Sequence, residues 1–419
     1  LNLSSMLPFQ KKLTNLFYVV LGLPATAMGF GLSVQIAVLS WILRTNYGLD
    51  IHEIGIVWAA GPLAGIIGQP IIGLISDEVW FWGGRRRPFI IIGGVFAALS
   101  ILALPYIGLI GQALGIGSII AVAITVALTL DLAINISLNP TRAIIADVTP
   151  EGEPRTKGYT WMQAISNLFG AGAYLISALL GNFTLIFIGA AIVFLFSVVP
   201  MFFIAEPRKL EATETGEVKA SATEWGELLK IYIAHAFSWV GIQTMFIYSF
   251  AFLEQRFNAT DPTKLGSIIG WSFFILNGAG AIFPILLLEP LAKKIGKVKT
   301  QVLAVASMSL GYLLIFLFVR STAMMYALFV LLSIGWSAVV SLPFAIMTEK
   351  VNKKRMGFFM GIFNLSVVLP QLISSFVLGS VIQNADNKSV VYFISGITLA
   401  VSAFLWAWVK EKKSRSLKL

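Results

Sequence analysis

Long runs without any charged side chain alternate along the chain with short segments that hold almost all of its charges. Ten of these runs are at least 20 residues long, and they cover residues 13–43, 54–76, 88–130, 158–205, 231–253, 265–288, 300–319, 321–348, 356–385 and 389–409. A helix needs about 20 apolar residues to cross a bilayer, so each run predicts at least one transmembrane helix. Barrel strands are excluded, because they are about 10 residues long and alternate polar with apolar positions.

Two of the runs are too long for one helix each. The run 88–130 breaks at the glycines between residues 108 and 117, and its second part continues past Asp131, while the run 158–205 breaks at Gly181-Asn182. The predicted fold class is therefore an all-α membrane protein with twelve transmembrane helices.

A polar stretch after the sixth predicted helix indicates how the chain is divided. Residues 206–227 are rich in glutamate and predict a flexible cytoplasmic linker. They separate two six-helix halves, 1–205 and 228–419, and such a pair of halves is typical of transporters with a substrate path between them.

Lysine and arginine are distributed unequally between alternate loops. With the N-terminus placed inside, the inner segments carry 25 of the 30 basic residues and the outer loops carry 5. Because basic residues stay on the cytoplasmic side, we expect both termini in the cytoplasm of a cell-membrane protein. The same distribution accounts for the net charge of +10, so no nucleic-acid partner is expected.

Composition excludes several classes of protein. The chain is 57% hydrophobic and only 12% charged, whereas soluble domains are about 45–50% apolar and about 25% charged. It has no cysteine and two histidines, so we expect neither a metal site nor a cofactor. No nucleophile, base or metal ligands cluster along the sequence, and an enzyme is therefore not expected.

One acidic residue lies near the middle of a predicted helix. A charge at the bilayer centre costs about 2.5–3.5 kcal/mol, and such residues usually serve function. We interpret Asp131 as a proton-accepting carboxylate. The alternative is a structural carboxyl that is protonated or paired with a neighbouring helix. A single isolated carboxylate suits a proton better than a sodium ion, which takes several oxygen ligands.

Polar residues that follow Asp131 share its helix face. Asn135 and Asn139 are four and eight residues on, and Arg142 is eleven residues on, about 16 Å along the axis. A slot lined by acid, amide and guanidinium fits a polyhydroxylated molecule. The alternative for Arg142 is a basic side chain that extends to the cytoplasmic interface.

A second motif lies between the second and third predicted helices. Gly73 permits close helix approach, and Asp77 can pair with the three arginines of Gly84-Arg85-Arg86-Arg87-Pro88 across the cytoplasmic helix ends. We therefore predict a gate formed by Gly73, Asp77, Arg85, Arg86 and Arg87. The alternative is that the arginines only set orientation.

The Gly73–Pro88 stretch resembles the signature loop of the major facilitator superfamily. Other motifs are similar to the sucrose-transporter-like branch of the glycoside-pentoside-hexuronide:cation symporters. They are Arg85–Ile90, Trp58–Gly65 with Gln69-Pro70, the set Asp131, Asn135, Pro140, Arg142 and Ala146-Asp147, Ser341–Ala345, and Gly361–Gln371. The resemblance spans nearly the whole chain and implies the two-half fold of that superfamily.

The resemblance also implies a function. It implies a proton-coupled symporter that imports a disaccharide such as sucrose, maltose or a related glucoside by alternating access, with Asp131 carrying the proton and Arg142 binding sugar. The expected partners are sugar, proton and lipid bilayer, and a monomer is expected. His52 departs from the family spacing, and residues 293–299 form only a degenerate gate motif, so the sugar stays open.

Further substrate contacts are expected from amides and an aromatic ring. Gln35 and Gln243 lie in the first and seventh helices, which line the central path in the superfamily, and Asn364 lies in the eleventh. Trp239, one turn before Gln243, could stack on a sugar ring. The alternative for each is helix packing. Two other functions stay open, a drug/proton exporter of the same fold and a membrane receptor that binds sugar without moving it.

Overall fold

A computed structural model describes residues 8–150, 153–207, 223–351 and 356–411. In these ranges the regular structure is helical, apart from an isolated bridge between Phe81 and Gly84. Ten helical stretches are long and apolar enough to cross a membrane: Asn15–Thr45, Arg87–Leu114, Ile119–Val148, Lys157–Leu180, Asn182–Phe202, Trp225–Phe257, Pro262–Ile295, Lys297–Phe318, Thr322–Thr348 and Gly361–Asn384. Two shorter apolar helices, Ile51–Ile66 and Val390–Trp406, complete the twelve predicted segments. The all-α membrane fold is confirmed.

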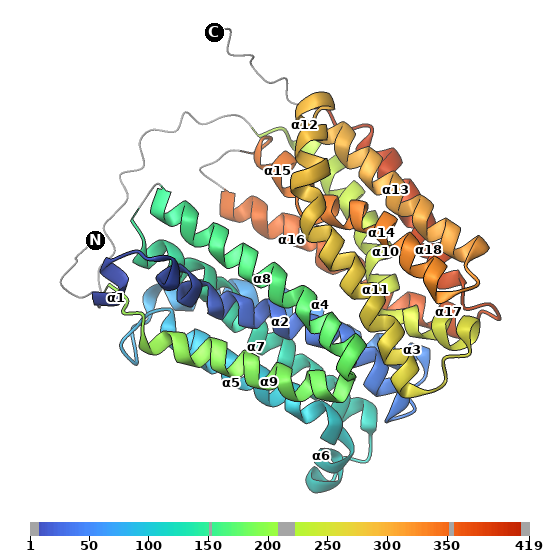
Figure 1. The fold of residues 1–419 in the computed structure, drawn as a ribbon, viewed down its shortest axis with the longest axis horizontal. Helices are drawn as coiled ribbons and strands as arrows, with labels where there is room; N and C mark the ends of the chain where they lie inside the picture. Colours follow the sequence, from blue (N-terminus) through green and yellow to red (C-terminus); the bar gives the residue numbers. More distant parts are fainter. Residues whose placement is uncertain (1–7, 151–152, 208–222, 352–355, 412–419) are drawn as a thin grey trace. The chain divides into compact units, whose positions relative to one another are not determined.

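The chain divides into two compact units, and the first comprises Leu1–Thr213 with Ala259–Phe274. Its helices up to the linker are α1 (Pro8–Lys11), α2 (Asn15–Thr45), α3 (Ile51–Trp58), α4 (Ala60–Glu78), α5 (Arg87–Ala103), α6 (Ile107–Leu114), α7 (Ile119–Val148), α8 (Glu153–Leu180) and α9 (Asn182–Val198). Within this unit α2 packs against α8 and α9, while α7 packs against α4 and α5 (Figure 1). Helix α7 thereby presents Asp131 to the interior of the unit.

The second unit comprises Glu214–Asn258 and Ile275–Leu419. Its helices are α10 (Trp225–Phe257), the second part of α11 (Pro262–Phe283), α12 (Glu289–Ile295), α13 (Lys297–Phe318), α14 (Thr322–Val339), α15 (Leu342–Thr348), α16 (Met356–Ile373), α17 (Gly379–Asn384) and α18 (Val390–Trp406). Helix α10 packs against α16 and α18, and α13 packs against α14 and α18. Two π-helical turns, Pro284–Leu288 and Ser374–Leu378, interrupt the α-helical pattern of this unit.

Local sequence signals set the helix ends. Asp50 and Glu53 form a reciprocal capping box at the start of α3, with two hydrogen bonds of 2.8 Å. Gly115 ends α6 at a φ of +67°, and Gly181 separates α8 from α9 at a φ of +86°. Residues with a side chain rarely adopt such positive φ angles, so glycine is favoured at both positions. The two predicted breaks in the long apolar runs are confirmed at these glycines.

The predicted linker differs from the structure at both of its ends. Glu206 and Pro207 are buried in the first unit, and α10 already begins at Trp225. Residues 208–222 lie outside the described part of the chain. The linker between them stays a prediction.

Candidate functional site

Asp131 is buried on α7, with 5% of its surface exposed. Its Oδ2 accepts a hydrogen bond of 3.0 Å from the Nε2 of Gln35 on α2, which is also buried. In the described ranges no basic side chain pairs with Asp131. An amide N–H can bind either ionisation state of a carboxyl group. Asp131 can therefore gain and lose a proton without breaking an ion pair inside the described chain.

Two glycines of α4 bring that helix close to Asp131 and Asn135. A Cβ atom at Gly61 would lie 3.3 Å from the Asp131 Oδ2, and a Cβ atom at Gly68 would lie 3.3 Å from the Asn135 Cβ. Both distances are shorter than ordinary van der Waals contacts, so a side chain at either position would crowd the acid or its neighbour. Gly61 was not among the predicted site residues, although the Trp58–Gly65 motif contains it.

Asn135 lies one turn after Asp131, and its amide turns back along its own helix. The Asn135 Nδ2 donates a hydrogen bond of 2.7 Å to the backbone oxygen of Asp131. Both side chains are buried on α7. The structure thus brings Gln35, Asp131 and Asn135 together in the first unit, as one cluster of acid and amides.

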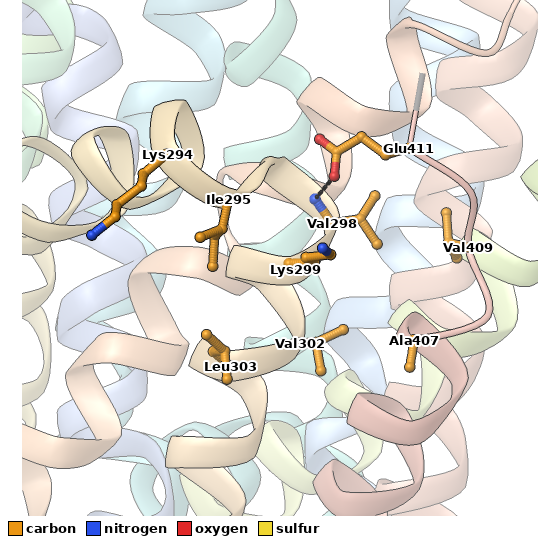
Figure 2. A pocket seen from close by; sticks show the side chains of 9 residues that line it. All are labelled: Lys294, Ile295, Val298, Lys299, Val302, Leu303, Ala407, Val409 and Glu411. Carbon is orange, nitrogen blue, oxygen red and sulfur yellow. Dashed lines mark hydrogen bonds between the residues drawn. The ribbon is translucent and has the colours of Figure 1, made fainter. Parts of the chain in front are cut away.

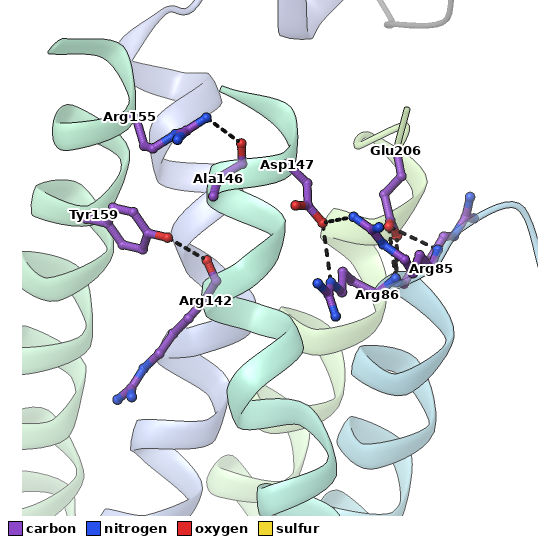
Figure 3. A network of polar contacts seen from close by, with 9 residues as sticks. Arg85, Arg86, Arg142, Ala146, Asp147, Arg155, Tyr159 and Glu206 are labelled. Atoms are coloured by element: carbon purple, nitrogen blue, oxygen red, sulfur yellow. Dashed lines mark hydrogen bonds and ion pairs between the residues drawn. The ribbon is translucent and has the colours of Figure 1, made fainter. Parts of the chain in front are cut away.

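Arg142 is exposed near the end of α7 that carries Asp147. Its carbonyl accepts a hydrogen bond of 3.2 Å from the Tyr159 hydroxyl, whereas its guanidinium points away from the Asp147 cluster (Figure 3). The guanidinium has no hydrogen-bond or ion-pair partner among the described residues. A planar group with five donors therefore remains available to a ligand, to water or to lipid headgroups.

The predicted site residues of the second unit lie on α10 and α16. Gln243 is buried, and its Oε1 accepts a hydrogen bond of 3.3 Å from the Gln371 Nε2. Asn364 is partly buried and makes no hydrogen bond with another described residue. The Gln243 carbonyl is therefore engaged between helices, as expected from the packing alternative.

Trp239 is held by a histidine that sequence reasoning did not assign to the site. The Trp239 Nε1 donates a hydrogen bond of 3.0 Å to the Nε2 of His235, one turn earlier on α10. His235 stacks on Phe363 at a centroid distance of 4.8 Å, and Trp336 meets the Trp239 ring edge-on at 6.2 Å. In the sequence, the four-residue spacing between His235 and Trp239 was the feature that could have indicated this contact. The indole N–H is occupied, and the Trp239 ring is only partly buried.

Two of the predicted gate arginines pair with an acid at the end of α7. The Asp147 Oδ2 lies 3.0 Å from the Arg85 Nη2 and 3.3 Å from the Arg86 Nε (Figure 3). Arg87 instead lies over the Phe202 ring, 5.5 Å from its centroid. Asp147 was present in the Ala146-Asp147 motif, but its pairing was not predicted.

The acid predicted to pair with the arginines was Asp77. Gly73 and Asp77 both lie in α4, but their side-chain surroundings are outside the part that the structure describes. The predicted pairing of Asp77 with residues 85–87 therefore stays a prediction.

Glu206 caps the start of α5 from a distant part of the sequence. Its carboxylate accepts hydrogen bonds from three successive backbone N–H groups, at 3.0 Å from Arg85, 2.8 Å from Arg86 and 2.6 Å from Arg87. A Cβ atom at Gly84 would collide with the Glu206 Oε1. The first N–H groups of a helix lack intrahelical partners and attract negative charge, so Glu206 stabilises this helix end. We call Arg85, Arg86, Asp147 and Glu206 the first helix-end network.

The second unit repeats this arrangement at the start of α13. The Glu411 carboxylate accepts hydrogen bonds of 2.5 Å from the Lys297 N–H and 3.2 Å from the Val298 N–H. The Lys297 ammonium pairs with Glu349, and Gly296 precedes the helix at a φ of +96°. We call Lys297, Glu349 and Glu411 the second helix-end network. It contains part of the segment 293–299 that the sequence identified as a degenerate gate.

In the described ranges, ten long apolar helices and two shorter ones form two units with a buried acid and repeated networks at the helix ends, which indicates a multi-pass membrane protein. The sequence profile described as Major Facilitator Superfamily matches residues 21–375, so the chain belongs to that superfamily. The expectation of a transporter rather than an enzyme is confirmed by this membership.

Related proteins agree with this membership. Sucrose transport protein SUC4 of Arabidopsis thaliana is 25% identical and aligns with 85% of this chain and 82% of its own length. Sucrose transport protein SUT2 of Oryza sativa subsp. indica is 24% identical, over 85% of this chain and 84% of its own length. The resemblance to sucrose transporters is therefore confirmed.

Solved structures share the fold. The nucleoside transporter NupG (D323A mutant) superposes with a TM-score of 0.76 at 12% identity, over 94% of this chain and 100% of its own. A D-xylose-proton symporter superposes with a TM-score of 0.71 at 16% identity, over 95% of this chain and 99% of its own. Both likenesses concern the fold alone.

Proposed function

We propose that this chain is a proton-coupled symporter that imports a disaccharide, namely sucrose, maltose or a related glucoside, by alternating access. The proposal is supported by relatives named as sucrose transport proteins, which align over most of both chains. The excess of basic residues on one side supports the cell membrane as its site, with both termini in the cytoplasm.

The observation that carries the proposal is the buried Asp131 with an amide as its hydrogen-bond partner. An ionised carboxylate without a cation nearby is costly in a low-dielectric interior, and protonation removes that cost. We infer that Asp131 takes a proton from the outer solution before the two halves reorient, and that it releases the proton on the cytoplasmic side. The Gln35 amide donates to the carboxyl group in both states and fixes its position.

Arg142 is the proposed anchor for the sugar. Its guanidinium has no partner among the described residues, and its five donors match several hydroxyl oxygens of one sugar. Gln243, Trp239 and Asn364 remain proposed contacts that lie in the second unit. Trp239 would offer its ring rather than its N–H, because His235 accepts that N–H.

The first helix-end network has a proposed role in the transport cycle. We infer that it holds the adjoining ends of α5, α7 and the segment after α9 together, so that the first unit moves as one body. Its hydrogen bonds and ion pairs link these three elements directly. In this proposal, Gly73 and Asp77 form the cytoplasmic gate together with the arginines of the first helix-end network.

Purified protein in liposomes tests the proposed function. Labelled sucrose, maltose and glucose are offered with an acidic outside, with a sodium gradient, and without a gradient. We expect accumulation of one disaccharide only with the acidic outside, and its loss when a protonophore is added. Accumulation driven by sodium alone would contradict proton coupling. Binding without uptake would indicate the receptor, and export of a lipophilic cation would indicate the exporter.

Asp131→Asn tests the proton carrier. Asparagine mimics the protonated acid but cannot release a proton, so uphill accumulation should be lost while exchange of labelled for unlabelled sugar continues. Asp386→Asn makes the same change at an exposed loop position and should transport normally. Uphill accumulation by Asp131→Asn would show that another group carries the proton.

Arg142→Lys tests the sugar anchor. Lysine keeps the charge but loses the planar fork of donors, so we expect a KM for sugar that is at least about tenfold higher, or ~1.4 kcal/mol. Arg320→Lys at an exposed loop position is the matched control. An unchanged KM with normal protein yield would remove Arg142 from the site and support its role as an interfacial anchor.

A further inference from the structure

A pocket of about 660 Å³ lies in the second unit, and none of the residues proposed to bind the proton or the sugar lines it. It is formed where the turn between α12 and α13 meets the chain that follows α18 (Figure 2). One wall is apolar, built from Ile295, Val302, Leu303 and Ala407. Two lysines, Lys294 and Lys299, also line it, so the pocket combines an apolar wall with positive charge.

The neighbouring charges are already paired. Lys293 forms an ion pair of 2.6 Å with Glu289, and Lys297 pairs with Glu349. The Glu411 carboxylate, which borders the pocket, accepts the backbone hydrogen bonds at the start of α13. Glu289 and Glu349 are thereby paired with lysines, whereas Glu411 accepts only backbone N–H groups and keeps its negative charge.

Lys294 and Lys299 differ from these neighbours. Neither ammonium group has a hydrogen-bond or ion-pair partner in the described ranges. Both side chains are exposed. The pocket therefore carries two unpaired ammonium groups and one carboxylate, that of Glu411, so its lining has a net positive charge beside the apolar wall.

The pocket lies at the ends of membrane segments. The segment Pro262–Ile295 ends at it, Lys297–Phe318 begins at it, and α18 ends at Trp406, one residue before the lining Ala407. Exposed apolar side chains continue from it, with Leu303 at 54% and Trp408 at 62%. Tryptophan and lysine at segment ends are typical of the level where hydrocarbon gives way to lipid headgroups.

We propose that this pocket binds the headgroup of an anionic phospholipid. The phosphodiester lies between Lys294 and Lys299, and an acyl chain lies along Leu303 and Val302. A free phosphate ion would gain nothing from the apolar wall, and its second negative charge would face the Glu411 carboxylate. The headgroup of a zwitterionic lipid contains a cation that repels the lysine ammonium groups, so such a lipid should bind more weakly. Four further basic residues in the sequence 412–418 favour an anionic membrane surface beside this end of the chain.

Native mass spectrometry of the intact, detergent-purified protein tests the proposal. The protein is titrated with phosphatidylglycerol and, separately, with phosphatidylcholine of the same acyl chains. We expect one phosphatidylglycerol to be retained at least about fivefold more tightly than phosphatidylcholine, since each lysine near an anionic headgroup contributes roughly a fivefold factor. The double variant Lys294→Gln/Lys299→Gln should lose this preference.

Two further variants separate the pocket from general charge. Lys11→Gln/Lys12→Gln removes two exposed lysines of the first unit and should keep the preference. Ala407→Trp fills the pocket but leaves both lysines in place, and it should lower retention of phosphatidylglycerol. Thermal unfolding of each variant without added lipid verifies that it is folded.

Several outcomes would overturn the proposal. An unchanged preference in Lys294→Gln/Lys299→Gln would place the lipid elsewhere, and an equal loss in Lys11→Gln/Lys12→Gln would indicate unspecific attraction. Competition by inorganic phosphate at concentrations equal to those of the lipid would indicate a soluble anion.

Discussion

The two helix-end networks have the same design but differ in burial and in the chemistry of the basic partner. In the first network, Arg85 and Arg86 share the carboxylate of Asp147, and the side chains of Arg85 and Asp147 are 18% and 8% exposed. In the second, Lys297 pairs with Glu349, and the two side chains are 41% and 35% exposed. A planar guanidinium fixes geometry, whereas an ammonium group is a mobile point charge.

This difference predicts unequal costs of breaking the networks. Removing one partner of a buried ion pair costs about 3–5 kcal/mol, because the remaining charge is left buried. An exposed ion pair is worth about 0–1 kcal/mol. The first network should therefore be a rigid element of its unit, and the second should be easy to open and close.

The largest effect is expected for Asp147→Asn. Two arginines lose their counter-ion in a largely buried place, so the first unit should be destabilised by about 3 kcal/mol. The initial rate of sugar uptake should fall at least tenfold, and the unfolding temperature in detergent should drop by several degrees. Glu349→Gln is the matched change in the second network and should alter uptake less than twofold. Equal effects of the two variants would contradict the comparison.

A smaller effect is expected for Glu206→Gln. The glutamine keeps one acceptor oxygen but turns a donor toward backbone N–H groups, so the cap should lose about 1–3 kcal/mol. Glu411→Gln should cost less than about 1 kcal/mol, because Glu411 is exposed and accepts from two N–H groups rather than three. Unfolding in detergent, followed by tryptophan fluorescence, compares both variants. A larger loss in Glu411→Gln would reverse the proposed order.

The networks also show how far the sequence predicted the molecule. Twelve membrane segments were predicted from the charge-free runs, because charges are costly in hydrocarbon and a run without them can be identified from the local sequence alone. Glu206 was assigned to the linker, because its contact with the start of α5 joins residues about 120 positions apart. The pairing of Asp147 with the arginines was not predicted for the same reason, since only the packing of α7 beside α5 brings Asp147 to them.

The candidate site was predicted in part for a related reason. The proximity of Asp131 and Asn135 follows from helical periodicity. The hydrogen bond between Gln35 and Asp131 joins α2 to α7, which are far apart in the sequence. The sequence indicated only that Gln35 should face the protein interior, because an amide is unfavourable in lipid. Gly61 was overlooked because glycine has no polar side chain. Its role is to leave space beside Asp131 that a larger residue would fill.

A third variant tests whether the second network is uniformly the weaker one. Gly296 has a φ of +96° and a ψ of +157°, a conformation that is essentially restricted to glycine. Gly296→Ala should therefore cost at least about 1–2 kcal/mol, because it strains the backbone and its Cβ would collide with the Glu411 carboxylate, and this is more than any charge substitution in the same network. Unfolding in detergent measures the loss. A neutral result would show that the turn before α13 relaxes freely.

The smallest effect is expected for Lys297→Arg, which gives the second network the basic residue of the first. Arginine can bind the Glu349 carboxylate with two parallel hydrogen bonds, but the pair remains exposed and is screened by salt. The gain should therefore stay below about 1 kcal/mol and should shrink between 50 mM and 500 mM salt. Unfolding temperatures at both salt concentrations measure it, with Lys293→Arg beside Glu289 as the exposed control. A gain that is larger and independent of salt would mean that burial does not separate the two networks, and the difference would then lie in the guanidinium alone.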